Sequence, residues 1–178
     1  MPEKIKIIIA GAGGHGKVVA DAVLKEGKYE IAGFADDTKT PGTIVFMNYK
    51  VLCAIQLQEV KKQASHFIVA IGDNSIRKRI FLEFSKEINP VTVIHPFVSL
   101  AEVIQLGAGS VILAGAVINT SSVIGENCII NSSALVDHDV SIGAHTHIGQ
   151  GALIGSGNII GDLNYIQQGQ NIKSIFHP

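Results

Sequence analysis

The sequence of 178 residues is poor in charge, in aromatic residues and in cysteine. Charged side chains make up 16% and aromatic ones 6%, tryptophan is absent, and the net charge is −1. With no block of like charges, the chain is not expected to bind nucleic acid or acidic lipid. Cys53 and Cys128 are too few for a disulfide framework or a zinc quartet, which favours a reducing compartment. The longest apolar opening run, Ile7 to Ala10, is too short for a signal peptide or a membrane span. We expect a cytoplasmic protein without a membrane segment.

The few charges are unevenly distributed along the chain. Residues 1–93 carry 23 of the 29 charged side chains, and residues 94–178 carry six. Each segment is long enough for a small domain, and hydrophobic residues, at 47% of the whole, are sufficient to fill a core. Pro90 disfavours a helix that continues across the join. We therefore predict two domains, residues 1–93 and residues 94–178.

The second segment is an internal repeat of six residues. Every sixth position is isoleucine, leucine or valine, and the position four residues further on is small through most of the run. A period of six is typical of hexapeptide β-helices, in which short strands stack coil on coil and bury a ladder of aliphatic side chains. Neither a helix nor a hairpin has this period. The anchor positions are Ile94, Leu100, Leu106, Ile112, Ile118, Ile124, Ile130, Val136, Ile142, Ile148, Ile154, Ile160, Ile166 and Ile172.

The last three hexads depart from the pattern. Their small positions hold Asn158, Asn164 and Gln170. Buried amides require hydrogen-bond partners, so we expect either a polar ladder or irregular final coils. A solenoid also needs an end that hides its open edge, and no closing segment is recognisable before Pro178.

The first segment alternates strands and helices. This order predicts a small parallel sheet with right-handed crossovers. We interpret Arg77-Lys-Arg79 as the solvated face of its last helix, with contact to a phosphate as the lesser alternative. The predicted strands are 4–10, 29–35, 66–71 and 90–94, the predicted helices are 17–26, 55–63 and 73–87, and residues 39–48 are a predicted loop.

A glycine-rich turn lies between the first strand and the first helix. Gly11-x-Gly13-x-x-Gly16 matches the dinucleotide fingerprint, and Asp36-Asp37 at the end of the next strand fits a contact to ribose or base. Three interpretations remain open: an NAD site, a site for one mononucleotide-sized ligand, or a tight turn alone. The second fits the length better, because a full dinucleotide domain needs two mononucleotide halves. A Walker loop is excluded because Val18 stands where serine or threonine would hold magnesium.

Four stretches, in this order, resemble the NeuD/PglD-type bacterial sugar acetyltransferases. They are the turn at 11–16, Phe34–Asp37, Ala70–Arg77, and Ile129–Asp139 with the following Ile142-Gly143. The resemblance implies a Rossmann-like nucleotide-sugar-binding domain followed by a left-handed parallel β-helix. It also implies an acyltransferase in surface glycan synthesis, acetyl-CoA as co-substrate, and a homotrimer that holds the donor between adjacent solenoids.

The resemblance assigns roles to individual residues. The catalytic base falls on His138 and its acidic neighbour on Asp139. An imidazole accepts a proton near neutral pH, which an amine or hydroxyl attacking a thioester must lose. The acetyl-CoA contact falls on His147. The nucleotide-sugar contacts fall on Gly13, Gly14, His15, Asp36, Asp37, Gly72 and Ser75.

Other aspects of function stay open at this level. The resemblance implies one of two acceptors, a UDP-4-amino sugar that is N-acetylated or a sialic acid that is O-acetylated. Family members generally continue for further coils that help hold the CoA arm, whereas this sequence stops at Pro178. The alternative is therefore a non-catalytic trimeric protein that binds a sugar nucleotide. His145 receives no role, and its spacing from His138 and His147 fits no metal-site template. We expect no metal.

Overall fold

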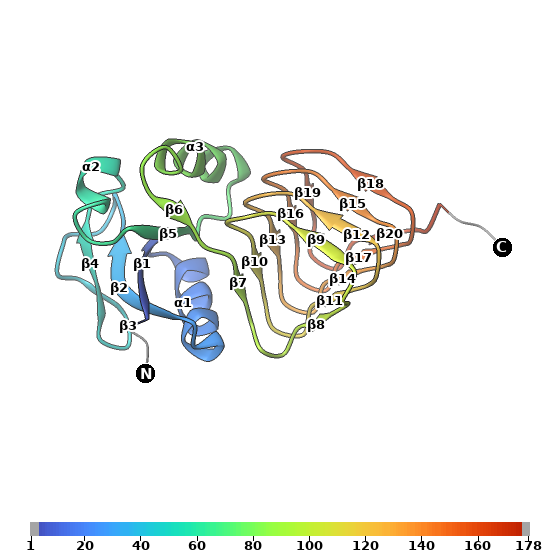
Figure 1. Ribbon diagram of the computed structural model, residues 1–178, viewed down its shortest axis with the longest axis horizontal. Coiled ribbons are helices and arrows are strands. Elements are labelled where there is room, and N and C mark those ends of the chain that lie inside the picture. The colour runs from blue at the N-terminus through green and yellow to red at the C-terminus, as the bar shows by residue number, and fades with distance from the viewer. Residues whose placement is uncertain (1–3, 176–178) are drawn as a thin grey trace. The chain divides into compact units, whose positions relative to one another are not determined.

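The chain divides into two units, with the boundary between Val93 and Ile94. The computed structural model describes residues 4–175. The first unit is a sheet flanked by helices, and the second is a stack of short parallel strands (Figure 1). The predicted fold class, a Rossmann-like parallel α/β unit followed by a β-helix of hexapeptide repeats, is therefore confirmed.

The first unit is built on a six-stranded sheet of order β3-β4-β2-β1-β5-β6. The central strand β1 (Ile5–Ala10) pairs in parallel with β2 (Tyr29–Ala35) and β5 (His66–Val69). Ile7, Ile8 and Ile9 are all fully buried, as expected for a parallel strand covered on both faces. Helix α1 (Gly14–Glu26) covers one face, and α2 (Leu57–Val60) and α3 (Asn74–Phe84) cover the other (Figure 1).

The largest difference from the prediction is an edge hairpin. The predicted loop at 39–48 contains β3 (Ile44–Phe46), which pairs antiparallel with β4 (Tyr49–Cys53). β4 in turn pairs in parallel with β2. The turn between the two strands contains Met47, whose φ of 49° is rare outside glycine. Three residues are too few to show a strand period, so this pairing was not visible in the sequence.

Several other boundaries differ from the prediction. Helix α1 starts within the glycine turn, at Gly14, and α3 ends at Phe84. The predicted last strand divides into β6 (Asn89–Pro90), which pairs with β5, and β7 (Val93–Ile94), which belongs to the solenoid. The predicted start of α3 is correct, since Asp73 caps the helix by accepting a 2.8 Å hydrogen bond from the Ile76 amide.

The solenoid has three parallel sheets, and each coil contributes one strand to each. We name them by one strand: the β16 face (β7, β10, β13, β16, β19), the β14 face (β8, β11, β14, β17, β20) and the β15 face (β9, β12, β15, β18). Paired residues are 18 apart, as in Ile112–Ile130–Ile148, so three hexads make one coil. The strands after β7 are β8 (Ser99–Leu100), β9 (Ile104–Leu106), β10 (Val111–Ile112), β11 (Val117–Ile118), β12 (Ser122–Ile124), β13 (Ile129–Ile130), β14 (Leu135–Val136), β15 (Ser141–Ile142), β16 (His147–Ile148), β17 (Leu153–Ile154), β18 (Ile159–Ile160), β19 (Tyr165–Ile166) and β20 (Asn171–Ile172).

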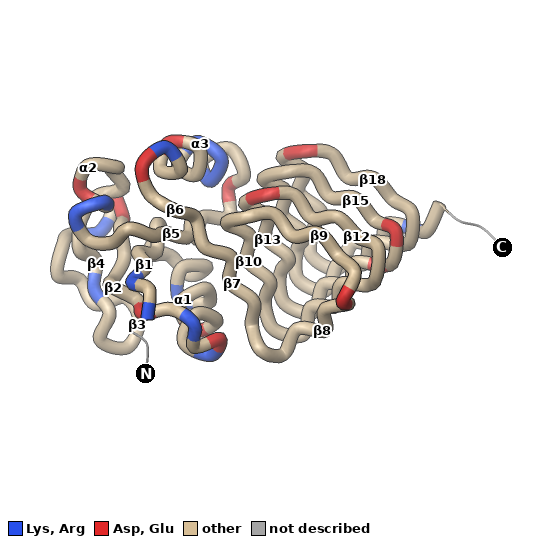
Figure 2. Tube along the Cα trace, in the orientation of Figure 1, with Lys and Arg blue, Asp and Glu red and all other residues tan. Residues whose placement is uncertain are grey.

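The hexad anchors form the core of the solenoid. The anchors from Ile112 to Ile154 are buried, and the small corner residues such as Ala116, Ala134 and Ala152 are buried with them. Leu100 is an exception and stays 37% exposed in β8, the end strand of its sheet. Figure 2 shows how few charged positions the coils carry, most of them acidic.

The final coils remain regular despite their amides. Asn158 Nδ2 donates to the carbonyl oxygens of Gly155 and Lys173, at 2.7 and 2.8 Å. Asn164 Nδ2 likewise donates to Gly161 O at 3.1 Å. These amides therefore bond to the backbone of their own corners, and strands β18 to β20 keep the register of the coils before them.

Candidate functional site

A cavity of ≈ 450 Å³ lies at the carboxyl ends of β1, β2 and β5. Its lining includes Gly11 after β1, Asp36 after β2 and Ala70 after β5. In an open parallel sheet this edge is where ligands bind. The structure brings six of the seven predicted nucleotide-sugar residues to this cavity and leaves out Ser75; the six are Gly13, Gly14, His15, Asp36, Asp37 and Gly72.

The glycines of the turn divide into two kinds. A Cβ on Gly16 would lie 2.2 Å from Gly11 O, and a Cβ on Gly11, whose φ is +112°, would lie 2.7 Å from Ala70 O. These two glycines are required by the close approach of backbone to backbone. A Cβ on Gly13 or Gly14 would meet no atom within 4 Å. Gly13 and Gly14 are therefore not needed for packing, and they leave space at the N-terminus of α1, where anions bind.

The acidic pair after β2 also divides into two roles. Asp36 Oδ2 accepts a 2.8 Å hydrogen bond from the Ala12 amide, and Oδ1 accepts three more from Thr38 and Lys39. Burial alone would raise the pKa of Asp36, but these hydrogen bonds outweigh it and hold the pKa below its ordinary value. Both oxygens thus shape the loops around the cavity. Asp37 accepts the Ile55 amide through Oδ1 at 2.7 Å, which leaves Oδ2 for a ligand.

Arg77 corrects the interpretation of the Arg77–Arg79 stretch. The side chain is 1% exposed, not solvated. Its guanidinium donates to the carbonyl oxygens of Ile71 and Gly72, both at 3.1 Å, and to Asn74 Oδ1 at 2.7 Å. Because a buried guanidinium must be hydrogen-bonded, these acceptors fix it in place, and it in turn fixes the loop that carries Gly72.

Arg79 lines the cavity itself, a position that fits the lesser alternative for this stretch, contact with a phosphate. It shares one face of α3 with Ile76 and Ile80, three residues before it and one after. This helical spacing was a usable signal, because an arginine between two residues that face the sheet edge lies near the same edge. A guanidinium there can bind a phosphate.

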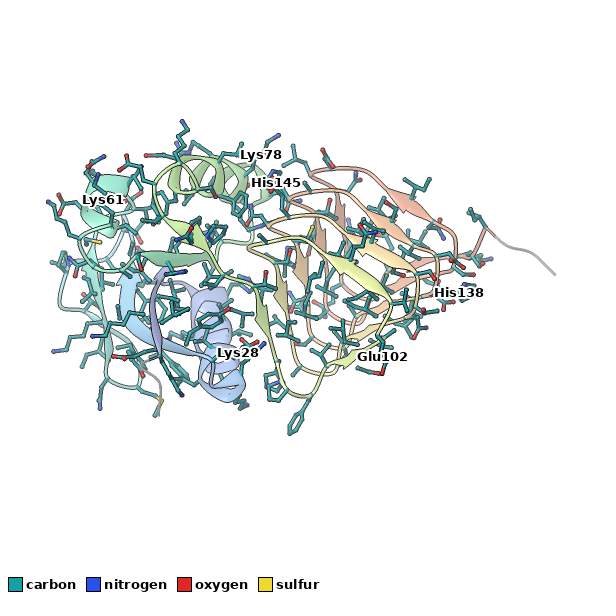
Figure 3. All side chains as sticks on the ribbon, in the orientation of Figure 1. Lys28, Lys61, Lys78, Glu102, His138 and His145 are labelled. Atoms are coloured by element: carbon teal, nitrogen blue, oxygen red, sulfur yellow. The ribbon has the colours of Figure 1, made fainter. Side chains whose placement is uncertain are left out.

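The predicted base, His138, lies on an outer corner of the solenoid. We call the turn between the β14 and β15 faces the His138 corner. The anchor Val136 points inward, and two residues later the His138 side chain points outward and is 48% exposed (Figure 3). The next residue, Asp139, has a positive φ of 59°. Ser121 and Gly157 occupy the same place in the adjacent coils and also have positive φ, of 61° and 75°. Aspartate is one of the few side chains that adopt this conformation readily.

His138 is held by carboxylates on both sides. Its Nδ1 lies 2.7 Å from Asp139 Oδ2, and its backbone amide donates to Asp137 Oδ1 at 2.8 Å. The hydrogen bond to Asp139 raises the pKa of His138, the negative charges of Asp137 and Asp139 add to it, and slight desolvation opposes it. With Nδ1–H donated to Asp139, Nε2 is the basic nitrogen.

The predicted acetyl-CoA contact, His147, lies on another part of the solenoid. It belongs to the β16 face, which is opposite the His138 corner in a coil of three strands. Its ring lies 5.0 Å, centroid to centroid, from that of Tyr165, and its Nε2 is 3.1 Å from Asn131 Nδ2. The sequence did not indicate Asn131 or Tyr165. Residues 18 apart are neighbours, so the pairing of His147 with Tyr165 follows once the coil length is known.

Comparisons with known proteins agree with this two-unit fold. The PglD N-terminal domain matches residues 6–84, and the bacterial transferase hexapeptide family (six repeats) matches residues 121–156. A solved structure of the acetyltransferase domain of PglB from Neisseria gonorrhoeae is 30% identical, with a TM-score of 0.73, and the match covers 95% of this chain and 88% of that one. The chain belongs to the NeuD/PglD-type family of bacterial sugar acetyltransferases.

Other members of the family have been solved with ligands. The same Neisseria domain in complex with acetyl coenzyme A is 29% identical, with a TM-score of 0.79 and coverage of 96% of this chain and 94% of that one. A mutant of perosamine N-acetyltransferase from Caulobacter crescentus, in complex with CoA and GDP-perosamine, is 29% identical, with a TM-score of 0.75 and coverage of 98% and 84%. No curated protein matches. The predicted enzyme class, an acyltransferase that uses acetyl-CoA, is thereby confirmed.

His145, which has no predicted role, and the two cysteines of this acetyltransferase are buried in the structure. His145 is buried on the corner between the β15 and β16 faces, with Nδ1 2.9 Å from Asn127 Nδ2 and Nε2 3.8 Å from Glu126 Oε1 (Figure 3). Cys53 and Cys128 are both buried. Within residues 4–175 no group of three potential ligands is placed to hold a metal ion. Among the same residues, no helix has the length and hydrophobicity needed to cross a bilayer.

Proposed function

We propose that this acetyltransferase moves the acetyl group of acetyl-CoA to the amino group of a nucleotide-linked amino sugar, with His138 as the general base. The observation that carries the proposal is the His138 Nδ1–Asp139 Oδ2 pair at 2.7 Å on an exposed corner. It directs Nε2 outward and increases its affinity for a proton. Perosamine N-acetyltransferase, one of the similar structures, is named for N-acetylation of such an acceptor.

The chemistry needs one proton acceptor. The amine nitrogen attacks the thioester carbonyl carbon, and the new C–N bond gives a tetrahedral intermediate. His138 Nε2 removes the proton that the nitrogen must lose. The C–S bond then breaks, the amide carbonyl re-forms, and the sulfur leaves as the thiol after taking up a proton from the imidazolium. Asp139 stabilises the imidazolium while it carries that proton.

The cavity of the first unit is the proposed site of the nucleotide. The diphosphate would lie against Gly13 and Gly14 at the N-terminus of α1, with Arg79 as its cation, and Asp37 Oδ2 would bind the ribose or the base. The length of the first unit, residues 1–93, favours a mononucleotide portion over a dinucleotide, because a full dinucleotide domain needs two mononucleotide halves. UDP is the nucleotide that we propose to test first.

The proposed assembly is a homotrimer. His138 and His147 lie on a corner and on the opposite face of one solenoid, so a donor that touches both would do so between two chains. Exposed apolar side chains on the coils also favour an interface, with Leu153 40% and Ile159 82% exposed. Light scattering at micromolar concentration should give the mass of three chains, and a monomeric mass would contradict the assembly.

Thiol release from acetyl-CoA tests the reaction directly. The acceptors are UDP- and GDP-linked 4-amino sugars, their hydroxyl analogues and free sialic acids, with the product identified by mass. We expect turnover with an amino sugar and none with its hydroxyl analogue. Turnover of sialic acid alone would move the assignment to O-acetylation. Binding of nucleotide sugars without turnover would instead identify a binding protein, and tight binding of NAD would exclude the proposed nucleotide site. The proposal implies a cytoplasmic enzyme, because acetyl-CoA and nucleotide sugars are made there.

A further inference from the structure

A cavity on the solenoid contains none of the predicted site residues. It has a volume of ≈ 380 Å³ and is formed by two successive coils, at strands β9 and β12 of the β15 face. Its lining combines a carboxylate, an amide and a hydroxyl with two exposed apolar side chains; these are Glu102, Gln105, Ser121, Val103 and Val123.

This cavity adjoins the His138 corner. Because a coil has 18 residues, Glu102, Thr120 and His138 occupy the same position in three successive coils. The Ser121 amide donates to Val103 O at 2.7 Å, and the Asp139 amide donates to Thr120 O at 3.1 Å, so hydrogen bonds join the wall of the cavity to the base. Figure 3 shows Glu102 and His138 along one outer edge of the coils, with His145 away from it.

The spacing of Glu102 and His138 fits a sugar ring. Parallel strands are about 4.8 Å apart, so two coils separate the two residues by roughly 10 Å along the solenoid. A pyranose ring with a hydrogen bond of about 2.8 Å at each end spans roughly that distance. An acceptor group held at His138 would therefore place the far hydroxyl groups of its ring beside Glu102.

The chemistry of the lining also fits a sugar. Carboxylate, amide and hydroxyl groups form hydrogen bonds with ring hydroxyl groups, and Val103 and Val123 offer apolar surface for the C–H face of the ring. No lysine or arginine lines this cavity among the described residues, so it offers no cation for a phosphate. The first-unit cavity has Arg79 and the N-terminus of α1 instead.

We propose that the cavity between Glu102 and Val123 holds the pyranose ring of the acceptor, with Glu102 and Gln105 bound to its hydroxyl groups. This inference rests on the proposed function, since it takes His138 as the place of reaction. It makes Glu102 a residue that determines specificity for the sugar, without a role in binding the nucleotide or the acetyl donor.

The test separates the sugar from the nucleotide. Glu102→Ala removes a hydrogen bond to a charged group, so the KM for the amino-sugar acceptor should rise about tenfold or more. The KM for acetyl-CoA and the Kd of the nucleoside diphosphate without its sugar should not change. Glu126→Gln is the control, because it removes a carboxylate of the same solenoid from a different corner. Since Glu102 is exposed, its replacement should leave the melting temperature unchanged.

Two results would overturn the inference. One is an acceptor KM for Glu102→Ala equal to that of the wild type, and the other is an equal loss of affinity for the nucleoside diphosphate alone. If the wild type shows no turnover with any acceptor, the proposed reaction fails, and calorimetry still tests the cavity. Glu102→Ala must then weaken binding of the nucleotide sugar and leave binding of the nucleoside diphosphate unchanged; no difference between the two ligands rejects the site.

Discussion

Asn119 Nδ2 donates a 3.0 Å hydrogen bond to Asp137 Oδ1, one coil further on, and the same oxygen accepts the backbone amide of His138. The hydrogen bond from Asn119 is the largest cause of the lowered pKa of Asp137. The two coils thus hold a carboxylate ionised directly before the proposed base, His138. Through Asp137, Asn119 positions the peptide that carries His138.

Replacement of Asn119 should affect turnover more than binding. Asn119→Ala loses one hydrogen bond to a charged group that remains partly solvated, so we expect kcat to fall about threefold to tenfold with the KM for acetyl-CoA unchanged. Asn119→Asp would place a second carboxylate beside Asp137 and add negative charge near the base, which should move the acidic limb of the pH–rate profile to higher pH. Profiles of kcat/KM for both variants check this. If the pH–rate profiles of both variants equal that of the wild type, Asn119 has no part in the mechanism.

Loss of the base should abolish most of the activity without unfolding the protein. For His138→Ala we expect kcat to fall by roughly 10²–10⁴. The side chain is half exposed, so stability should stay within about ±0.5 kcal/mol. Thiol-release assays measure the loss of kcat, and thermal melts measure the change in stability separately.

The control for this variant is His66→Ala, a partly exposed histidine of β5 outside both cavities. His145 is unsuitable as a control although the sequence gives it no role. It is buried against Asn127, so its loss should lower stability by about 1–3 kcal/mol. Near-normal turnover of His138→Ala would reject the general-base assignment.

The dependence on pH has a definite sign. Asp139 raises the pKa of His138, and only the neutral imidazole accepts a proton, so the acidic limb of kcat/KM should lie above the ordinary histidine value of about 6.5. Asp139→Asn removes the hydrogen-bonded charge and should move that limb to lower pH. At a pH well above the acidic limbs of the wild type and of Asp139→Asn, the variant should keep much of its activity. A limb that stays in place would mean that another group titrates.

The glycine turn offers a matched pair of substitutions. Gly16→Ala would force a Cβ against Gly11 O, so stability should fall by about 1–3 kcal/mol. Gly14→Ala has room for the methyl group in the protein alone, so the melting temperature should hold while the affinity for UDP falls. Thermal melts and calorimetry with UDP distinguish the two positions. Unchanged UDP affinity in a folded Gly14→Ala protein would contradict a phosphate contact at this turn.

The solenoid was predictable in detail because its signal repeats. Each anchor such as Ile130 has the same neighbours in every coil, so the pattern of one hexad fixes the next. The pairing of Asn119 with Asp137 was also accessible, because three hexads per coil bring residues 18 apart together. The first unit was less predictable. The burial of Arg77 depends on two loop carbonyl oxygens, and the β3–β4 hairpin depends on pairing with β2, neither of which leaves a local period in the sequence.

The positive φ at Asp139 has a consequence for enzyme design. The position must supply a carboxylate within reach of His138 Nδ1, and its backbone must turn the chain in a conformation that most side chains resist. Glutamate would keep the charge but fit the turn poorly, and glycine would fit the turn but lose the charge. To introduce such a histidine base into another coil of a solenoid, a histidine and the aspartate after it would therefore have to be introduced together, at the same position of the corner.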